Sequence, residues 1–368
     1  MTENVEIYRQ LQEHLDKMPI GFPKAKSGSD IRLLKHLFTP EEAKIAMLLR
    51  FGWLRDLEPL ETIYERAKDT DLSISELEQI LDRMVKNGSI MFKKEGDKKY
   101  YGNALLAVGM FEFQVDQLTE GFIKDFRDYY DEVWLFEAIR VKGAQMRVIP
   151  VEHSIEPKHH IANYDDLEKL IESTEGPFMV LNCICRQMKD ILDEPCKKTS
   201  RRELCLGFGK GAQIFLDLER GRSISREDAL EILRKNEEDG LVLQPDDSLE
   251  LCFICSCCSC CCENLSKYVL MPNPGSFTIS NYFAEVDTDL CSGCGTCVEI
   301  CPMKAFKLKN DVSILKRKRC IGCGNCIVKC PSEAISLKQK ERQFTPFPTM
   351  DDLFDRIKAR KKILDEKK

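Results

Sequence analysis

Eight cysteines near the C-terminus fall into two copies of one pattern. The pattern C-x-x-C-x-x-C-x-x-x-C-P runs from Cys291 to Pro302 and again from Cys320 to Pro331. A 4Fe–4S cube takes four thiolates, and a C-x-x-C-x-x-C loop can wrap three of them around one cube. Glycines between these cysteines let the backbone press close to such a cluster. The spacing therefore predicts two 4Fe–4S clusters. A zinc ribbon is the simpler alternative, but it needs only paired C-x-x-C motifs.

Residues 282–340, which include both copies, resemble the bacterial two-cluster ferredoxin domain. In that family the fourth cysteine of each run ligates the other cluster. The resemblance therefore implies two interleaved sets of ligands. One cluster is held by Cys291, Cys294, Cys297 and Cys330, and the other by Cys320, Cys323, Cys326 and Cys301.

The remaining eleven cysteines form a second region with no familiar spacing. They are Cys183, Cys185, Cys196, Cys205, Cys252, Cys255, Cys257, Cys258, Cys260, Cys261 and Cys262. Basic residues such as Arg186, Lys197 and Arg201 lie among the first four, and positive charge lowers thiol pKa values and offsets the charge of a thiolate-ligated cluster. Soft thiolates in a chain already rich in cysteine favour iron–sulfur chemistry. We expect metal here, as one or two additional iron–sulfur clusters.

Other interpretations of this region stay open. Adjacent cysteines point in different directions, so the runs Cys257-Cys258 and Cys260-Cys261-Cys262 favour different irons or clusters, or a larger non-cubane cluster. The cysteine density is comparable to that of the heterodisulfide reductase catalytic subunit, but its Cys-Cys-Gly signature is missing. A zinc site or a redox-active pair, Cys252 and Cys255, would leave most thiols unexplained.

Residues 1–115 predict helices that end in a β-hairpin. Thr39-Pro40-Glu41-Glu42 reads as a capping box, and Pro59 starts another helix. Ser75 and Glu78 predict the cap of a third helix, which Asn87-Gly88 closes. The hairpin spans SIMFKKEGDKKYYG. Helix, helix, helix and ribbon is the order of a winged helix.

A winged helix raises the alternative of DNA binding. Lys93, Lys94, Lys98 and Lys99 on the predicted wing could meet phosphates. The third helix, however, exposes Glu76, Glu78 and Asp82, and negative charge opposes entry into a DNA groove. Protein docking is the expectation that we favour.

The rest of the chain supplies connections. Residues 116–270 predict a connector and a cysteine-rich metal-binding α/β domain, with strand-like segments MRVIPVE and FMVL. The run Leu206–Gly211 falls short of a phosphate loop and predicts a turn into a helix near Ala212. His153, His159 and His160 read as surface histidines. Residues 341–368 predict an amphipathic basic helix that either packs on the body or docks an acidic partner.

Composition limits the class of protein. Nineteen cysteines without a secretory signal predict a reducing, anaerobic cytoplasm and metal ligation instead of disulfides. No apolar run approaches membrane-spanning length. The net charge of −6 argues against nucleic-acid binding by the whole chain. The fold class that we expect is α+β and multidomain.

The whole chain resembles a group of anaerobe proteins that combine a winged helix, a C-x-C-R and C-L-x-F-G segment, an I-C-x-C-C-x-C-C-C run and a two-cluster ferredoxin domain. The matching parts here are residues 1–115, Cys183 to Arg186 with Cys205 to Gly209, Ile254 to Cys262, and Cys291 to Pro331. The resemblance implies redox work. We expect an electron carrier or an oxidoreductase subunit that serves a redox partner. The alternatives are a redox-responsive DNA-binding regulator, and a reductase whose unusual cluster acts on a disulfide or small substrate.

Overall fold

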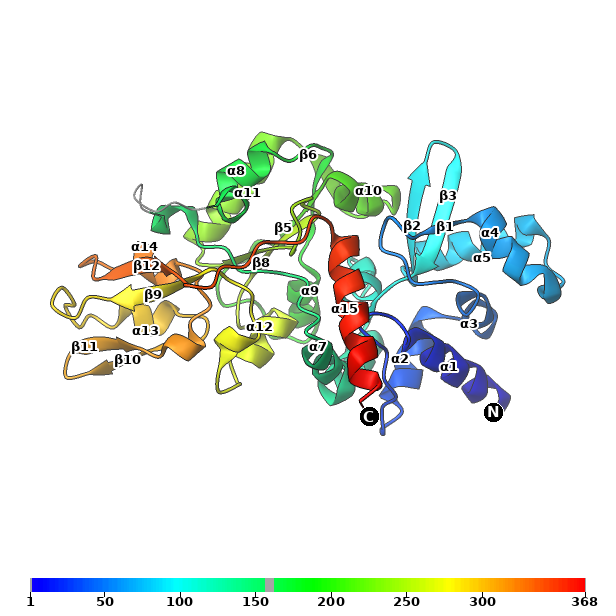
Figure 1. Cartoon of the computed structure of the whole chain (residues 1–368), viewed down its shortest axis with the longest axis horizontal. Helices are drawn as coiled ribbons and strands as arrows, with labels where there is room; N and C mark the ends of the chain where they lie inside the picture. Colours follow the sequence, from blue (N-terminus) through cyan, green and yellow to red (C-terminus); the bar gives the residue numbers. More distant parts are fainter. Residues whose placement is uncertain (1, 156–161, 368) are drawn as a thin grey trace. The chain divides into compact units, whose positions relative to one another are not determined.

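The computed structural model describes residues 2–155 and 162–367, which fall into two compact units (Figure 1). The first unit comprises residues 1–143, 213–220 and 349–368, and the second comprises 144–212 and 221–348. Helix and sheet are mixed in the chain, as expected for an α+β protein. The division into four domains that the sequence suggests stays a prediction.

The first unit joins helices to a small antiparallel sheet of order β1-β3-β2. Its elements are α1 (Thr2–Leu15), α2 (Ser29–Leu37), α3 (Pro40–Ala46), β1 (Glu58–Pro59), α4 (Leu60–Ala67), α5 (Ile74–Lys86), β2 (Ile90–Glu95), β3 (Lys98–Asn103), α6 (Glu120–Tyr129), α7 (Leu135–Val141) and α15 (Met350–Asp365). A π-helical turn, Tyr130–Trp134, joins α6 to α7.

One of the two predicted capping boxes in this unit forms at the expected residues, and the other forms two residues earlier. Thr39 and Glu42 form the expected capping box at the start of α3. At α5 the box is formed by Ser73 and Glu76, two residues before the predicted Ser75 and Glu78. Both pairs have the S-x-x-E spacing, and the apolar residues Leu77, Ile80 and Leu81 of the helix are buried.

The C-terminal helix α15 packs into the first unit. Its apolar side chains Leu353, Phe354 and Ile357 are buried. The carboxylate of Asp351 accepts hydrogen bonds from the backbone N–H groups of Leu54 and Arg55. Packing against the body, one of the two expectations for this helix, accounts for its apolar face.

The second unit holds a five-stranded antiparallel sheet of order β6-β4-β5-β8-β7 and two smaller two-stranded sheets. Its elements are α8 (Leu167–Glu172), β4 (Phe178–Asn182), α9 (Ile184–Ile191), β5 (Glu203–Phe208), β6 (Arg222–Ile224), α11 (Arg226–Glu238), β7 (Val242–Pro245), β8 (Phe253–Cys257), α12 (Glu263–Tyr268), β9 (Tyr282–Val286), α13 (Thr296–Ile300), β10 (Phe306–Lys309), β11 (Val312–Leu315), α14 (Asn325–Val328) and β12 (Ile335–Gln339). Helix α10 (Gly209–Asp217) begins in this unit and ends in the first.

The five-stranded sheet has an apolar face and a sulfur-bearing face. Helices α8 and α11 cover the apolar face, where Leu206 of β5 and Ile254 of β8 join one core (Figure 1). Asn236 of α11 donates a hydrogen bond to Ser256 Oγ on the same side. Because strand side chains alternate between faces, Cys205, Cys255 and Cys257 point to the opposite side.

Two expectations for this unit need correction. The segment MRVIPVE forms no strand of a sheet; Met146 and Arg147 make isolated bridges to Asp246 and Ile279. Pro150 has no N–H to continue a ladder. The strand β5, which the sequence did not predict, runs directly into α10, and this helix begins at Gly209, before the predicted Ala212.

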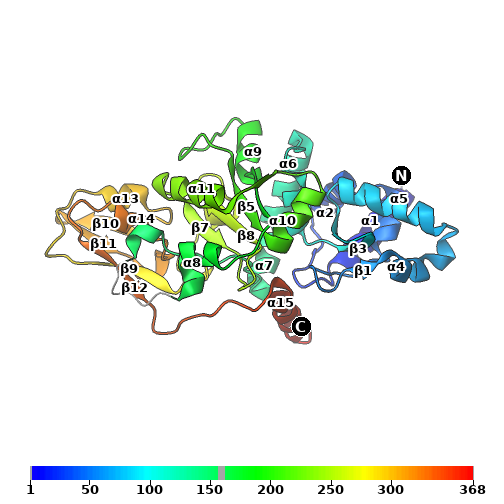
Figure 2. The ribbon, with the colours of Figure 1, turned by 90° about the horizontal axis from the view of Figure 1, so that it is seen from above.

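The cysteine repeat forms the two smaller sheets and their short helices. Strands β9 and β12 pair with each other, and β10 pairs with β11 (Figure 2). Helices α13 and α14 follow the glycines Gly295 and Gly324, each with positive φ. The two copies of the motif are therefore also two copies of one local structure.

Within residues 2–155 and 162–367, no helix combines the length and the apolar character that crossing a membrane requires.

Candidate metal centres

The first ferredoxin-like hollow is lined by Cys291, Cys294 and Cys297 together with Cys330 from the other copy. Ser313 donates its backbone N–H to Cys291 Sγ at 3.4 Å, and its hydroxyl lies 3.0 Å from Cys297 Sγ. Such bonds stabilise negative charge on sulfur. Cys294 is exposed, so this hollow lies at the surface.

The second hollow is lined by Cys320, Cys323 and Cys326 together with Cys301 from the first copy. Ala284 N–H donates to Cys320 Sγ at 3.4 Å, and Ala305 N–H donates to Cys301 Sγ at 3.3 Å. Burial raises the pKa of Cys323 to about 12. A thiolate at this position therefore needs a bound cation to offset its charge.

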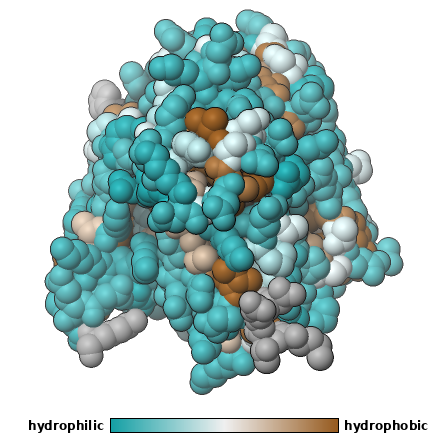
Figure 3. All heavy atoms as spheres, turned by 90° about the vertical axis from the view of Figure 1, so that its right-hand side faces the viewer, coloured by the Kyte–Doolittle hydropathy of each residue, from teal (hydrophilic) through white to brown (hydrophobic). Residues whose placement is uncertain are grey.

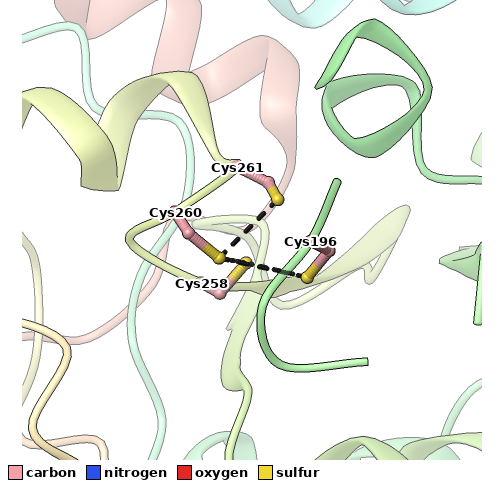
Figure 4. A group of neighbouring side chains, drawn as sticks. All are labelled: Cys196, Cys258, Cys260 and Cys261. Carbon is pink, nitrogen blue, oxygen red and sulfur yellow. Dashed lines mark hydrogen bonds between the residues drawn. The ribbon is translucent and has the colours of Figure 1, made fainter. Parts of the chain in front are cut away.

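In the central region, four thiols form a compact group that we call the four-thiol set: Cys196, Cys258, Cys260 and Cys261 (Figure 4). Their sulfurs all lie within 4.8 Å of one another. The sulfur of Cys260 lies 3.3 Å from that of Cys258 and 3.7 Å from that of Cys261. The turn after β8 directs the sulfurs of Cys260 and Cys261 inward, toward the same point (Figure 4). Whether they serve different irons or clusters, as the sequence suggests, stays a prediction.

Six other thiols form a series on the sulfur-bearing face of the sheet, and we call them the six-thiol set. Hydrogen-bonding contacts link them in the order Cys185, Cys183, Cys205, Cys255, Cys257 and Cys262. Cys205 and Cys255 lie on the paired strands β5 and β8. Cys183 caps α9 and Cys262 caps α12. Hydrogen bonds from Cys205 and Cys257 lower the pKa of Cys255 to about 6.

Arg186 lies between the two sets. Its side chain is buried, and its Nη1 donates hydrogen bonds to Cys183 Sγ at 3.2 Å and to the Ser256 carbonyl oxygen at 3.0 Å. Its Nη2 donates to Cys258 Sγ at 3.5 Å. Burial disfavours the charge of Arg186, but the sulfurs of Cys183 and Cys258 raise its pKa above the ordinary value. The buried guanidinium of Arg186 thus donates hydrogen bonds to sulfurs of both sets.

Cys252 lies directly before β8 and is not one of the thiols that define the four-thiol set or the six-thiol set. Its backbone N–H donates to Asp246, and its sulfur lies 3.6 Å from the Glu250 carbonyl oxygen. Its Cβ packs against Gly211. Among the predicted surface histidines, His153 borders a cavity in this unit, and His159 and His160 lie outside the described residues.

That cavity, of about 290 Å³, is a feature that the sequence did not reveal. It lies between α11 and the ferredoxin-like segment, with Glu237, Asn325 and Val328 in its wall. Glu237 is 8% exposed; its carboxylate accepts a hydrogen bond from Glu152 N–H, and its other oxygen has no partner among the described residues. Desolvation raises the pKa of Glu237 to about 7.

The donor chemistry of these centres fits iron and sulfide. Each hollow offers four cysteine sulfurs, backbone N–H donors and glycine backbone at close range, which a 4Fe–4S cube requires. At Gly293 a Cβ would stand 2.2 Å from the Asp311 carbonyl oxygen, so that only glycine fits the loop. The all-sulfur composition of the central sets likewise selects soft metals.

Comparison with known proteins identifies the C-terminal segment. Residues 290–342 match the family described as 4Fe-4S dicluster domain. A 56-residue stretch is 33% identical to a subunit of the ion-translocating oxidoreductase complex of Methanosarcina acetivorans, covering 15% of this chain and 20% of that protein. A 33-residue stretch is 42% identical to ferredoxin-2 of Desulfomicrobium norvegicum, covering 9% of this chain and 56% of that protein. The chain thus matches less than two thirds of either relative. No solved structure matches it.

Proposed function

The C-terminal segment is a ferredoxin-type 4Fe–4S domain, and from this premise we propose that the protein transfers single electrons between that domain and a further iron–sulfur cluster at the six-thiol set. One observation carries the proposal. Cys301 and Cys323 of the second hollow pack in the same apolar cluster as Cys257 and Cys262 of the six-thiol set. The two groups of sulfurs are therefore neighbours within one unit.

The residues between these groups suit such a transfer. Val148, Val242, Met303 and Ile321 fill the space and exclude water. The backbone fixes the spacing, because Val151 N–H donates to the Cys323 carbonyl oxygen and Asn325 Nδ2 donates to the Gly240 carbonyl oxygen. A bound 4Fe–4S cluster takes up and releases one electron. Rigid apolar surroundings that exclude water keep the environment of the cluster nearly unchanged when it takes up or releases an electron.

We assign the ligands of the two ferredoxin clusters as the resemblance implies. The cysteines that line the first hollow, three from one copy and Cys330 from the other, would hold one cube. Those that line the second, three from the other copy and Cys301, would hold its neighbour. The crossed fourth cysteines would keep the two cubes close, and this supports one-electron exchange between them.

We place the exchange with a redox partner at the first hollow. Cys294 is exposed there, and so are Leu290 and Leu308, at 56% and 45%. Lysines of the neighbouring hairpin, Lys307 and Lys309, are exposed as well. The pKa of Lys316 is lowered by the charge of Lys307, so an acidic partner surface would relieve this repulsion.

Rapid mixing tests the route. After anaerobic reconstitution, a one-electron donor should reduce the ferredoxin clusters first and the cluster at the six-thiol set afterwards. In Cys294→Ala, which removes a ligand of the outer cluster, the second phase should slow. If the inner cluster is reduced as fast in this variant as in the wild type, electrons enter elsewhere and the route is wrong.

For residues 1–115 we infer a winged helix that contacts proteins in place of DNA. On the wing, Lys99 pairs with both Glu78 and Asp82 of α5, and Lys93 pairs with Glu95. These ion pairs occupy two of the four wing lysines that phosphates would need. The face that carries α1–α5 is mostly hydrophilic with small apolar patches (Figure 3). Absence of salt-dependent binding to duplex DNA in either redox state would support this assignment.

A further inference from the structure

The sulfurs of the four-thiol set lie closer together than the sulfurs of the two ferredoxin ligand sets. Among the residues that the structure describes, it is the one group of three or more metal-binding side chains whose ligand atoms all lie within 4.8 Å of one another. The cysteines around the two ferredoxin hollows stand farther apart. This difference matters because a cube holds each thiolate on a separate iron, whereas a single ion holds all of its thiolates on one centre.

The distances fit a single ion. A tetrahedral site with metal–sulfur bonds of about 2.3 Å places its sulfurs about 3.8 Å apart. The Cys196–Cys258, Cys196–Cys260 and Cys260–Cys261 sulfur distances are 3.7, 4.0 and 3.7 Å, and Cys258 and Cys260 are at 3.3 Å. We propose that Cys196, Cys258, Cys260 and Cys261 bind one tetrahedral metal ion, Zn²⁺ or Fe²⁺, without inorganic sulfide.

The surroundings stabilise the charge of such a centre. One divalent ion with four thiolates carries two net negative charges. Arg186 supplies a buried positive charge beside Cys258. Backbone N–H groups of Lys198 and Thr199 donate to Cys196, and that of Lys197 donates to Cys260. Donors of this kind orient thiolate ligands and offset their charge.

The position of the ion gives it a structural role. Cys258, Cys260 and Cys261 lie between Cys257 and Cys262, which both belong to the six-thiol set. Cys196 comes from the loop between α9 and β5. An ion at this point would tie that loop to the turn between β8 and α12, and so fix the two ends of the six-thiol set. The site is thus separate from the electron route, and it does not depend on that route.

Metal and sulfide analysis of Cys260→Ser tests the proposal, with Cys252→Ser as the matched control from the same strand region. We expect Cys260→Ser to lose one metal ion per chain while inorganic sulfide stays unchanged. Cys252→Ser should keep both. Loss of about four irons together with about four sulfides would show a cube and overturn the proposal. Retention of all metal in Cys260→Ser would overturn it as well.

A measurement on the wild type covers the case in which Cys260→Ser fails to fold. For zinc, X-ray absorption should show about four sulfurs at about 2.3 Å and no neighbouring metal. For iron, Mössbauer spectra should show a mononuclear tetrathiolate component beside those of the clusters. A wild-type protein with no zinc and no mononuclear iron would contradict the inference.

Discussion

The Nη1 atom of Arg186 donates a hydrogen bond to the sulfur of Cys183 at 3.2 Å, in a site where the arginine is only 1% exposed. The same guanidinium reaches Cys258 of the four-thiol set. A fixed charge at this point would act on both of the metal centres that we propose for the central region, and it is therefore the position from which they can be perturbed together.

Arg186→Met should lower the reduction potential of the cluster at the six-thiol set. A charged hydrogen bond contributes about 1.5–3 kcal/mol, which corresponds to about 60–130 mV for one electron. The potential falls because the positive charge favours the reduced, more negative state. A redox titration monitored by electron paramagnetic resonance measures the shift.

Arg201→Met is the control for this experiment. Arg201 pairs with Asp239 and is partly exposed. We expect its replacement to leave the potential within the error of the titration. Equal shifts in both variants would mean that the effect of Arg186 is general and owes nothing to its contacts with sulfur.

The sequence predicts a metal site well where the ligands are close together in the chain, and poorly where the fold brings distant cysteines together. The ferredoxin cysteines are separated by two or three residues, so their spacing alone indicates the cluster type, and comparison confirms a ferredoxin-type 4Fe–4S domain there. In the central region, Cys205 and Cys255 become neighbours through the register of two strands fifty residues apart. No local pattern encodes that register.

The directions of the cysteine side chains explain why the grouping of the central thiols is not evident from the sequence. Cys255 and Cys257 share a face because β8 is extended, whereas Cys258, Cys260 and Cys261 converge because the chain turns after Cys257. A run of adjacent cysteines does not show where a strand ends. The position of Ser73 as the cap of α5 is a similar case, since two overlapping S-x-x-E patterns are equally good in sequence.

Cys294→Ala should remove the signal of one ferredoxin cube and spare the other. Cys294 lines the first hollow only, so about four irons should be lost while the second set of ligands is untouched. Iron quantification and electron paramagnetic resonance of the reduced protein check this. Ser292→Ala, which changes a residue of the same hollow that is not a thiol, should keep all iron. Unchanged spectra in Cys294→Ala would show that the ligand assignment is wrong.

Gly293→Ala should weaken retention of the outer ferredoxin cluster. Gly293 has a φ of +71°, and its added Cβ would lie 2.2 Å from the Asp311 carbonyl oxygen. The left-handed backbone costs about 1–2 kcal/mol and the steric clash about 1–3 kcal/mol more. The rate at which cluster absorbance is lost under a chelator measures the effect.

Gly96→Ala is the control, a substitution at a positive-φ glycine outside the cysteine repeat. Gly96 also has positive φ, but nothing lies within 4 Å of its added Cβ, so only the backbone cost applies. It belongs to the hairpin between β2 and β3, away from the cysteine repeat in sequence. Cluster loss in Gly96→Ala as fast as in Gly293→Ala would contradict the steric explanation.

Glu237 should make the second unit less stable as the pH rises toward neutrality. Its pKa in the folded chain is about 7, chiefly because the carboxyl is desolvated, with the Glu152 carboxylate contributing, whereas the ordinary value is 4.5. The folded state therefore binds more protons than the unfolded state between these values. Stability from this group is fully present below about pH 4.5 and is lost as pH rises through about 7, by up to about 1.4 kcal/mol per pH unit.

Glu237→Gln should remove this dependence, because the amide stays neutral at every pH. Unfolding of a cluster protein is irreversible, so the measured quantity is the half-life of cluster absorbance at elevated temperature between about pH 5 and pH 8. Glu238→Gln is the control, since Glu238 borders the same cavity but is exposed. The wild type and Glu238→Gln should lose half-life across this range, while Glu237→Gln should lose less. An equal slope in all three proteins would show that Glu237 titrates normally and that burial does not hold its proton.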